Sequence, residues 1–154
     1  MTWVIGVPGF LTRGVLVGDI RITIRDPTAN EPDSEIEGVQ KVHRVGDNIA
    51  IGFAGNIDTG FRMVGDIAEA LKRSIPEGMA LTQPSRYLLR WRRRARWAWR
   101  HELSDRDRAG GCSLLWIGAL PPDHVGFSAT VGWVLHSPEF EPEHIPSRTA
   151  RAIA

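Results

Sequence analysis

Hydrophobic residues at the start of the chain are grouped as in β-strands, in runs separated by turn residues. Residues 2–7 (TWVIGV) are rich in β-branched and aromatic types, and residues 14–24 (GVLVGDIRITI) resume that composition after a segment with proline and glycine. Two such runs across a short glycine-containing connection predict a β-hairpin. Both runs are apolar at nearly every position, which predicts a sheet covered on both faces.

A second hairpin follows the same rule. Residues 39–45 (VQKVHRV) and 49–55 (IAIGFAG) flank a turn at Gly46, Asp47 and Asn48. The stretch between the two hairpins, residues 25–35 (RDPTANEPDSE), is polar and rich in turn residues. It therefore predicts a surface loop with no core of its own.

From Asn56 onward the apolar period changes to that of a helix. Residues 56–74 carry an apolar stripe at helical spacing, formed by Ile57, Phe61, Val64, Ile67, Ala68 and Leu71. Asn56 or Asp58 could cap the start of this helix, and Pro76 lies just beyond its end. A second helix is predicted over residues 85–103, with one face formed by Leu88, Trp91, Ala95, Ala98 and Trp99.

The last third of the chain returns to strand patterns. Residues 104–111 (SDRDRAGG) interrupt the helical period, and residues 111–120 (GCSLLWIGAL) predict a buried strand. Residues 126–137 (GFSATVGWVLHS) predict one long strand or a strand pair, and the chain turns apolar again at the terminal ARAIA. Two hairpins, two helices and further strands, without an internal repeat, predict an α+β fold with helices laid against antiparallel sheets.

Length, charge and cysteine content narrow the class of protein. The 154 residues fit one domain spanning 1–154, and a net charge of +1 gives the whole molecule no strong attraction to nucleic acid. Cys112 is the only cysteine, so an internal disulfide and a multi-cysteine metal site are both excluded. We find no secretory pattern at the start and no apolar run long enough for a membrane span. The expectation is a cytoplasmic protein without a cofactor or metal.

Three short motifs follow one another along the chain in an order that indicates a fold family. Thr2 heads the first strand, a Gly18-Asp19-Ile20-Arg21 step lies in the second, and Lys41-Val42-His43-Arg44 is followed by Gly52-Phe53-Ala54-Gly55 at the start of a helix. This order resembles the proteasome-type N-terminal-nucleophile (Ntn) hydrolases and is similar to proteasome β-subunits and the bacterial HslV peptidase. The resemblance is closest over residues 2–75. It implies a four-layer αββα sandwich and a threonine peptidase that hydrolyses unfolded polypeptide, within a homo-oligomeric ring that an ATPase could regulate.

The resemblance implies a role for each of four residues. Thr2 would become the N-terminal nucleophile after Met1 is removed, and its own α-amine, with a reference pKa of about 7.7–8.0, would accept the hydroxyl proton. Lys41 would favour the neutral amine, Asp19 would hold Lys41, and the Gly55 N–H would stabilise the oxyanion. The alternatives are that Thr2 is an ordinary strand residue, that Asp19 and Lys41 form a structural ion pair, and that Gly55 only starts a helix.

The sequence also departs from the family pattern. The first hairpin is one residue longer than usual, and residues 25–35 lengthen the stretch between Asp19 and Lys41. In the family, a strand with a G-S-G-type turn, further helices and a supporting Ser/Asp pair would come next, and the terminal ARAIA resembles the beginning of that strand. The sequence is therefore expected to represent a fold shortened at its C-terminal end, and the alternative function is a non-catalytic structural subunit or a truncated relative.

An arginine-rich segment raises a rival interpretation. Seven arginines lie between Arg86 and Arg100, interleaved with Trp91, Trp97 and Trp99. Basic and aromatic residues together can bind nucleic acid, and a basic amphipathic helix can bind a membrane surface. We favour a helix whose tryptophans pack inward while its arginines are solvated or pair with acidic residues, and so expect no nucleic-acid or membrane partner. Cys112, in an apolar strand, is interpreted as buried packing, and His43 as non-catalytic.

Overall fold

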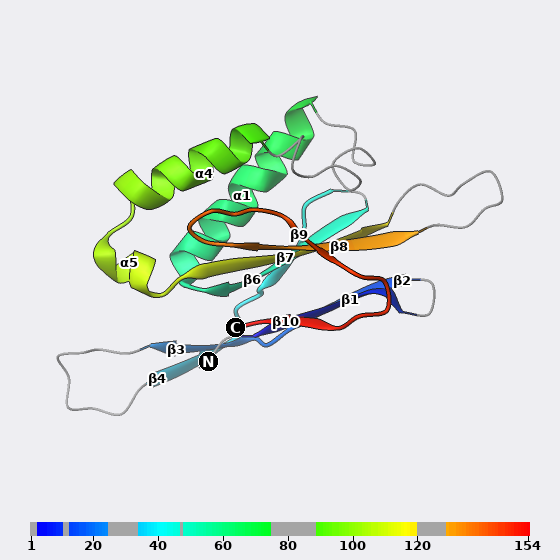
Figure 1. The fold of residues 1–154 in the computed structure, drawn as a ribbon. Coiled ribbons are helices and arrows are strands. Elements are labelled where there is room, and N and C mark those ends of the chain that lie inside the picture. Colours follow the sequence, from blue (N-terminus) through cyan, green and yellow to red (C-terminus); the bar gives the residue numbers. More distant parts are fainter. Residues whose placement is uncertain (1–2, 11–12, 25–33, 47, 75–88, 120–128) are drawn as a thin grey trace.

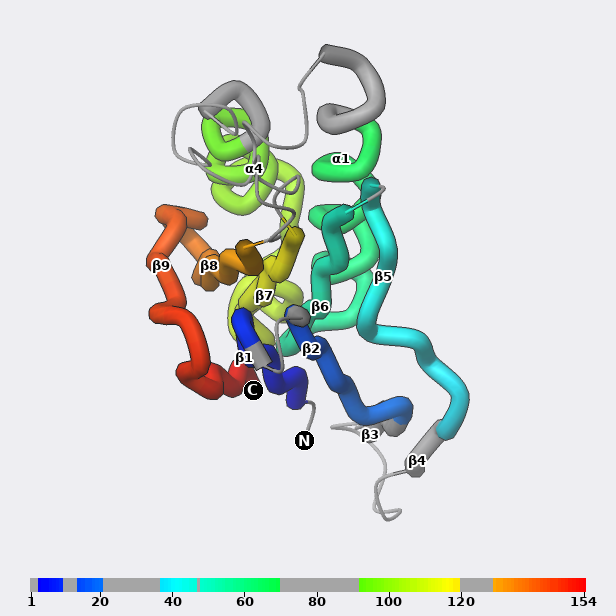
Figure 2. Tube along the Cα trace, turned by 90° about the vertical axis from the view of Figure 1, so that its right-hand side faces the viewer, coloured from blue at the N-terminus to red at the C-terminus, as the bar shows by residue number. Residues whose placement is uncertain are grey.

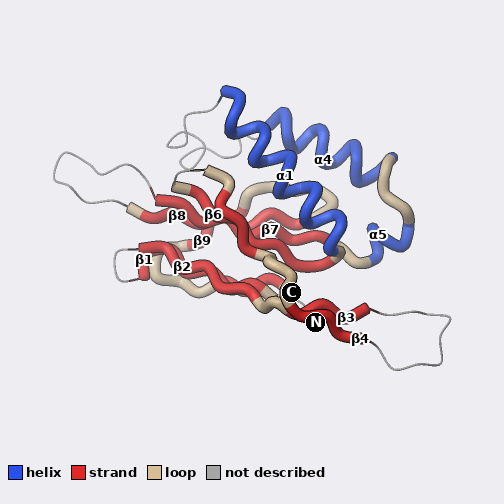
Figure 3. Tube along the Cα trace, turned by 180° about the vertical axis from the view of Figure 1, so that it is seen from behind, coloured by secondary structure: helices blue, strands red, loops and turns tan. Residues whose placement is uncertain are grey.

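The computed structural model describes residues 3–10, 13–24, 34–46, 48–74, 89–119 and 129–154. Two long helices cover one face of a five-stranded antiparallel sheet, and a three-stranded antiparallel sheet packs against its other face (Figures 1 and 3). Viewed from the side, the helices, the large sheet and the small sheet form three successive layers (Figure 2). The predicted α+β sandwich is confirmed.

The large sheet forms the centre of the molecule. In spatial order its strands are β5 (Val42–Arg44), β6 (Ile49–Gly55), β7 (Cys112–Ala119), β8 (Thr130–His136) and β9 (Glu143–Ile145). The predicted second hairpin is β5 paired with β6, and the buried strand predicted near residue 112 is β7. The pattern in residues 126–137 corresponds to the single strand β8, although residues 126–128 lie outside the described part. The short strand β9 was not predicted.

The small sheet has the order β10-β1-β2 and includes the predicted first hairpin. Its strands are β1 (Val4–Phe10), β2 (Arg13–Gly18) and β10 (Arg151–Ile153), and Val4 lies opposite both Gly18 and Ile153. The terminal strand expected at ARAIA is therefore β10, which adds to the edge of β1. The two ends of the described chain consequently lie close together (Figure 1).

Two predictions around residues 14–37 were wrong. The second strand ends at Gly18, and β3 (Arg21–Ile24) begins a separate two-stranded ribbon with β4 (Ser34–Glu37) that projects from the sandwich (Figure 1). Residues 34 and 35 were expected in a loop because their composition is acidic and polar. The antiparallel pairing of β4 with β3, in which Glu37 lies opposite Arg21, forms this ribbon, and local composition does not indicate it.

The first helix, α1 (Ile57–Ser74), confirms the predicted change of period. Asn56 caps it, because the Thr59 N–H donates to Asn56 Oδ1 at 3.0 Å. Of the predicted stripe, Val64 and Ile67 are buried against the sheet, together with Met63, which was not predicted, whereas Phe61 is 42% exposed, so its place on the inward face was wrong. Pro76, predicted to follow the helix end, lies outside the described residues.

The second long helix, α4 (Leu89–His101), was predicted over residues 85–103. Residues 85–88 lie outside the description, and the helix ends at His101, two residues before the predicted end. Ala95, Ala98 and Trp99 are buried as predicted, but Trp97 is 54% exposed. Residue 97 lies about 200° around the helix from Ala95, so the expectation that its indole packs inward was wrong. A short helix, α5 (Asp105–Ala109), occupies the segment predicted as a break.

The arginines of α4 are paired with the acidic loop that follows β8. Arg92 forms an ion pair with Glu141, Arg96 contacts Glu139 and Glu141, and Arg100 contacts Glu139 at 3.1 Å. Burial is the main cause that lowers the pKa of the Arg92 guanidinium below its ordinary value. The interpretation of these arginines as partners of acidic residues is confirmed for this set. No helix of the described chain is long and apolar enough to cross a membrane.

Glycines set the separation of the two sheets. A Cβ at Gly6 would lie 2.3 Å from the Leu115 side chain, and one at Gly52 would lie 2.5 Å from Val4. The side chains of Leu115 and Val4 therefore occupy space that a larger residue at these glycines would need. They belong to a buried cluster between the sheets, distinct from the larger cluster under the helices.

The outer face of the small sheet is apolar and open to solvent. Ile5 and Val17 lie opposite each other on this face and are 39% and 50% exposed. Among the described residues no helix or strand covers them, so the face that the sequence predicted to be covered is bare in this part of the chain. The outer helical layer of the expected four-layer sandwich is likewise not present among the described elements.

Cys112 gives a test of the core under the helices. The residue is buried, and burial raises the pKa of its thiol from 9.0 to about 12. We expect no reaction with a disulfide reagent at pH 8 until the protein is unfolded. Because the folded pKa is raised, the thiol ionises more readily in the unfolded protein. Ionisation of Cys112 should therefore leave the free energy of unfolding unchanged below about pH 9 and lower it between pH 9.0 and about 12. Thiol titration of native and urea-unfolded protein measures the first effect, and prompt native reactivity would contradict it.

Candidate active site

Lys41 and Asp19 meet at one end of the sandwich. The Lys41 side chain is completely buried, and its Nζ donates to Asp19 Oδ1 in an ion pair. Asp19 Oδ2 accepts a hydrogen bond of 3.2 Å from the Trp3 N–H, and the Asp19 N–H donates to the Trp3 carbonyl oxygen at 3.2 Å. The carboxylate thus connects the buried ammonium to the backbone of the residue that follows Thr2.

Three local features bring these groups together. Asp19 follows the last residue of β2, Lys41 directly precedes β5, and Trp3 directly precedes β1. Glycine at position 18 permits the approach, because a Cβ there would lie 3.2 Å from Val42 Cγ2 and 3.7 Å from Lys41 Cβ. An unpaired buried ammonium is strongly unfavourable, and the ion pair with Asp19 offsets that cost for Lys41.

Gly55 lies at the same end of the large sheet. The Phe53 N–H donates to the Lys41 carbonyl oxygen at 3.1 Å, which places Lys41 beside β6 two residues before Gly55. Gly55 has φ of +99°, and a Cβ at this position would lie 2.5 Å from the Gly111 carbonyl oxygen. Both the backbone conformation and the available space therefore require glycine at the junction of β6 and α1.

An aromatic cluster lies on the helix side of the same strands. His43 stacks on Phe53 with ring centroids 6.0 Å apart, and Phe61 of α1 meets both rings edge-on. Phe53 is fully buried, whereas Phe61 is 42% exposed. His43 packs in this cluster through its ring contacts, and its interpretation as non-catalytic stays a prediction.

A second polar pair lies on the other face of the large sheet, toward the small sheet, and was missed by the sequence reasoning. Ser113 and His136 lie opposite each other on β7 and β8, with 2.8 Å between Ser113 Oγ and His136 Nδ1. Ser113 also lies opposite Ala54, the residue before Gly55. The two residues are 23 positions apart, and only the strand register, which local patterns do not supply, could have paired them.

The four predicted site residues are thus placed as follows. Asp19 and Lys41 are in direct contact, and Gly55 is at the same end of the large sheet. Thr2 lies outside the described residues. Among the residues that the structure describes, no group of three or more His, Cys, Asp or Glu side chains could hold a metal ion.

Comparison with known proteins identifies the fold. No protein family and no curated protein matches the sequence. Among solved structures, the chain matches the crystal structure of eukaryotic HslV from Trypanosoma brucei with a TM-score of 0.60 and 18% sequence identity. The match covers 99% of this chain and 71% of the HslV chain. The chain therefore has the fold of HslV, a proteasome-type Ntn hydrolase, as the order of Thr2, Asp19, Lys41 and Gly55 predicted.

Proposed function

We propose that this protein is a threonine peptidase of the proteasome type, which hydrolyses peptide bonds in unfolded polypeptides with Thr2 as its N-terminal nucleophile. The observation that carries the proposal is the buried Lys41 ammonium, held by Asp19, whose carboxylate also binds the backbone N–H of Trp3. A positive charge is thereby fixed beside the start of β1, immediately after the residue that would carry the nucleophile. The HslV-like fold supports the same class of enzyme.

Removal of Met1 would give Thr2 both groups that the reaction needs. A threonine hydroxyl is a weak nucleophile until a base accepts its proton, and a free α-amine with a pKa of about 7.7–8.0 suits that task near neutral pH. The Lys41 ammonium favours the neutral form of the amine, because two neighbouring positive charges repel. Asp19 holds the Lys41 side chain in position through the ion pair.

The reaction then proceeds through an acyl-enzyme. Thr2 Oγ attacks the substrate carbonyl carbon while its proton passes to the α-amine, and the Gly55 N–H donates to the developing oxyanion. The C–N bond breaks, the leaving amine takes the proton, and an ester links the acyl group to Thr2. Water, deprotonated by the same amine, hydrolyses the ester and restores the hydroxyl.

We further propose that the active form is a cytoplasmic homo-oligomeric ring that an ATPase partner could regulate. The support is the similarity to HslV at the level of the fold. A ring encloses its active sites, which would restrict substrates to unfolded polypeptide.

Two measurements on the purified protein test the proposal. Intact-mass analysis should show a chain lacking Met1, and the same sample should hydrolyse a fluorogenic peptide. Retention of Met1 together with peptide turnover would contradict Thr2 as the nucleophile. A processed protein without turnover would instead favour a non-catalytic structural relative.

A further inference from the structure

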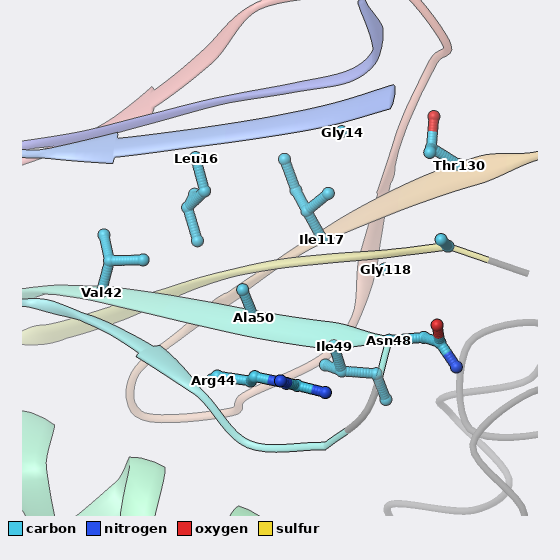
Figure 4. Close-up of a pocket in the computed structure, with 11 residues that line it drawn as sticks. Gly14, Leu16, Val42, Arg44, Asn48, Ile49, Ala50, Ile117, Gly118 and Thr130 are labelled. Atoms are coloured by element: carbon cyan, nitrogen blue, oxygen red, sulfur yellow. The ribbon is translucent and has the colours of Figure 1, made fainter. Parts of the chain in front are cut away.

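A cavity of about 420 Å³ opens between the two sheets, at the opposite end of β6 from Gly55. Gly14 and Leu16 of β2 form one wall, and residues of β5, β6, β7 and β8 form the other. Figure 4 shows Leu16 pointing from β2 toward Ala50, with Val42 and Ile117 pointing back from the large sheet. In the described structure β2 and β5 are the outermost strands of their sheets on one side.

Small residues on the facing strands account for the hollow. Packed sheets lie about 10 Å apart, and large side chains normally fill that distance. Here Ala50 and Ala119 of the large sheet contribute little volume, whereas the space beside Gly14 is taken by Ile117, whose Cγ2 would lie 2.4 Å from a Cβ at that glycine. Protein interiors are close-packed and leave few voids larger than a water molecule, whereas ligand sites occupy about 300–1,000 Å³. The size of this cavity is therefore that of a ligand site.

The cavity has distinct polar groups on its two sides. Thr130 on β8 has a buried Oγ1 atom with no hydrogen-bond partner among the described residues. Arg44 on β5 is the only charged residue among the described ones that line the cavity, and its Nε donates to the Gly46 carbonyl oxygen at 2.9 Å. β5 and β8 are separated by three strand spacings, or about 14 Å.

We propose that this cavity binds an extended amphipathic carboxylate with a second polar group at its far end, such as an ω-hydroxy fatty acid. The carboxylate lies at the Arg44 guanidinium, the apolar chain runs between the sheets past Leu16 and Ile117, and the terminal hydroxyl pairs with Thr130 Oγ1. A buried hydroxyl without a partner is unfavourable, and this ligand supplies the missing hydrogen bond. The site does not depend on the proposed peptidase activity.

Calorimetric titration of the purified protein with ω-hydroxydecanoate tests the assignment. Wild-type protein should bind one molecule saturably and melt at a higher temperature with the ligand present. Arg44→Gln should weaken binding about tenfold, because a charge-assisted hydrogen bond is lost. Arg93→Gln, which removes an exposed arginine of α4 on the far side of the large sheet, is the matched control and should bind as wild type does.

The Thr130→Val variant distinguishes a hydroxyl that binds the ligand from one that stabilises the protein itself. Valine keeps the shape and removes the unpartnered hydroxyl, so the ligand-free variant should melt at or above the wild-type temperature. Its affinity should fall toward that of wild type for decanoate, which lacks the terminal hydroxyl. Ala50→Phe should fill the cavity and abolish binding, with circular dichroism checking that the variant is folded.

Three results would overturn the assignment. The first is the absence of saturable binding to wild-type protein. The second is equal affinity of wild type, Arg44→Gln and Thr130→Val for ω-hydroxydecanoate. The third is a ligand-free Thr130→Val protein that melts well below wild type, because the hydroxyl would then have a partner within the protein itself.

Discussion

Protein in which Thr2 is replaced by alanine is expected to hydrolyse a fluorogenic peptide at least about 10³-fold more slowly than wild type. The substitution removes the hydroxyl that forms the acyl-enzyme and leaves the α-amine in place. Alanine is also small enough to permit removal of Met1, so processing is preserved and the loss of rate is assigned to the hydroxyl alone. Steady-state turnover of mass-verified, processed protein measures the effect.

Thr2→Ser is the matched control for this experiment. Serine keeps both the hydroxyl and the α-amine, so the variant should retain measurable turnover. Equal turnover of wild type and processed Thr2→Ala would exclude the proposed mechanism, because no other residue in the resemblance supplies nucleophile and base together.

Replacing Lys41 with alanine is expected to reduce turnover nearly as much as Thr2→Ala. The ammonium acts on the same proton transfer as the Thr2 amine, and groups that act as one unit have non-additive effects. The variant should also lose about 3 kcal/mol of unfolding free energy, because removal of one partner leaves the Asp19 carboxylate, only 15% exposed, without its cation. Urea unfolding and peptide turnover, measured on the same sample, give the two quantities.

A double variant separates the catalytic effect of Lys41 from its structural effect. Lys41→Met with Asp19→Asn removes both charges and keeps most of the buried volume, so much of the lost stability should return. Turnover should not return, since the ammonium is still absent. Recovery of both stability and turnover would show that Lys41 has only a structural role.

The sequence predicted most of the elements because their signals are local. The helix of residues 56–74 and its cap depend on neighbours within a few positions. The structure confirms the helix and selects Asn56 from the two predicted caps. The hairpin of β5 and β6 likewise follows from two runs and the turn between them. Such features require no knowledge of the rest of the fold.

The features that the sequence did not predict depend on contacts between distant segments. β4 forms because Ser34–Glu37 pairs with β3, and Trp97 is exposed because the sheet lies under the opposite side of α4. For the site, the order of motifs predicted that Asp19 and Lys41 would meet. It did not indicate the hydrogen bond between Asp19 and the Trp3 backbone, or the pairing of Ser113 with His136. Each of these depends on strand register.

The glycines between the sheets have a consequence for how this interior can change over evolution. Gly6 receives the Leu115 side chain, and Gly52 receives that of Val4, each within 2.5 Å of where a Cβ would lie. A mutation that enlarges either glycine is therefore tolerated only if the facing residue becomes smaller. Each glycine and its facing residue should vary together among descendants of this sequence, so that the spacing between the layers is inherited as linked pairs of residues.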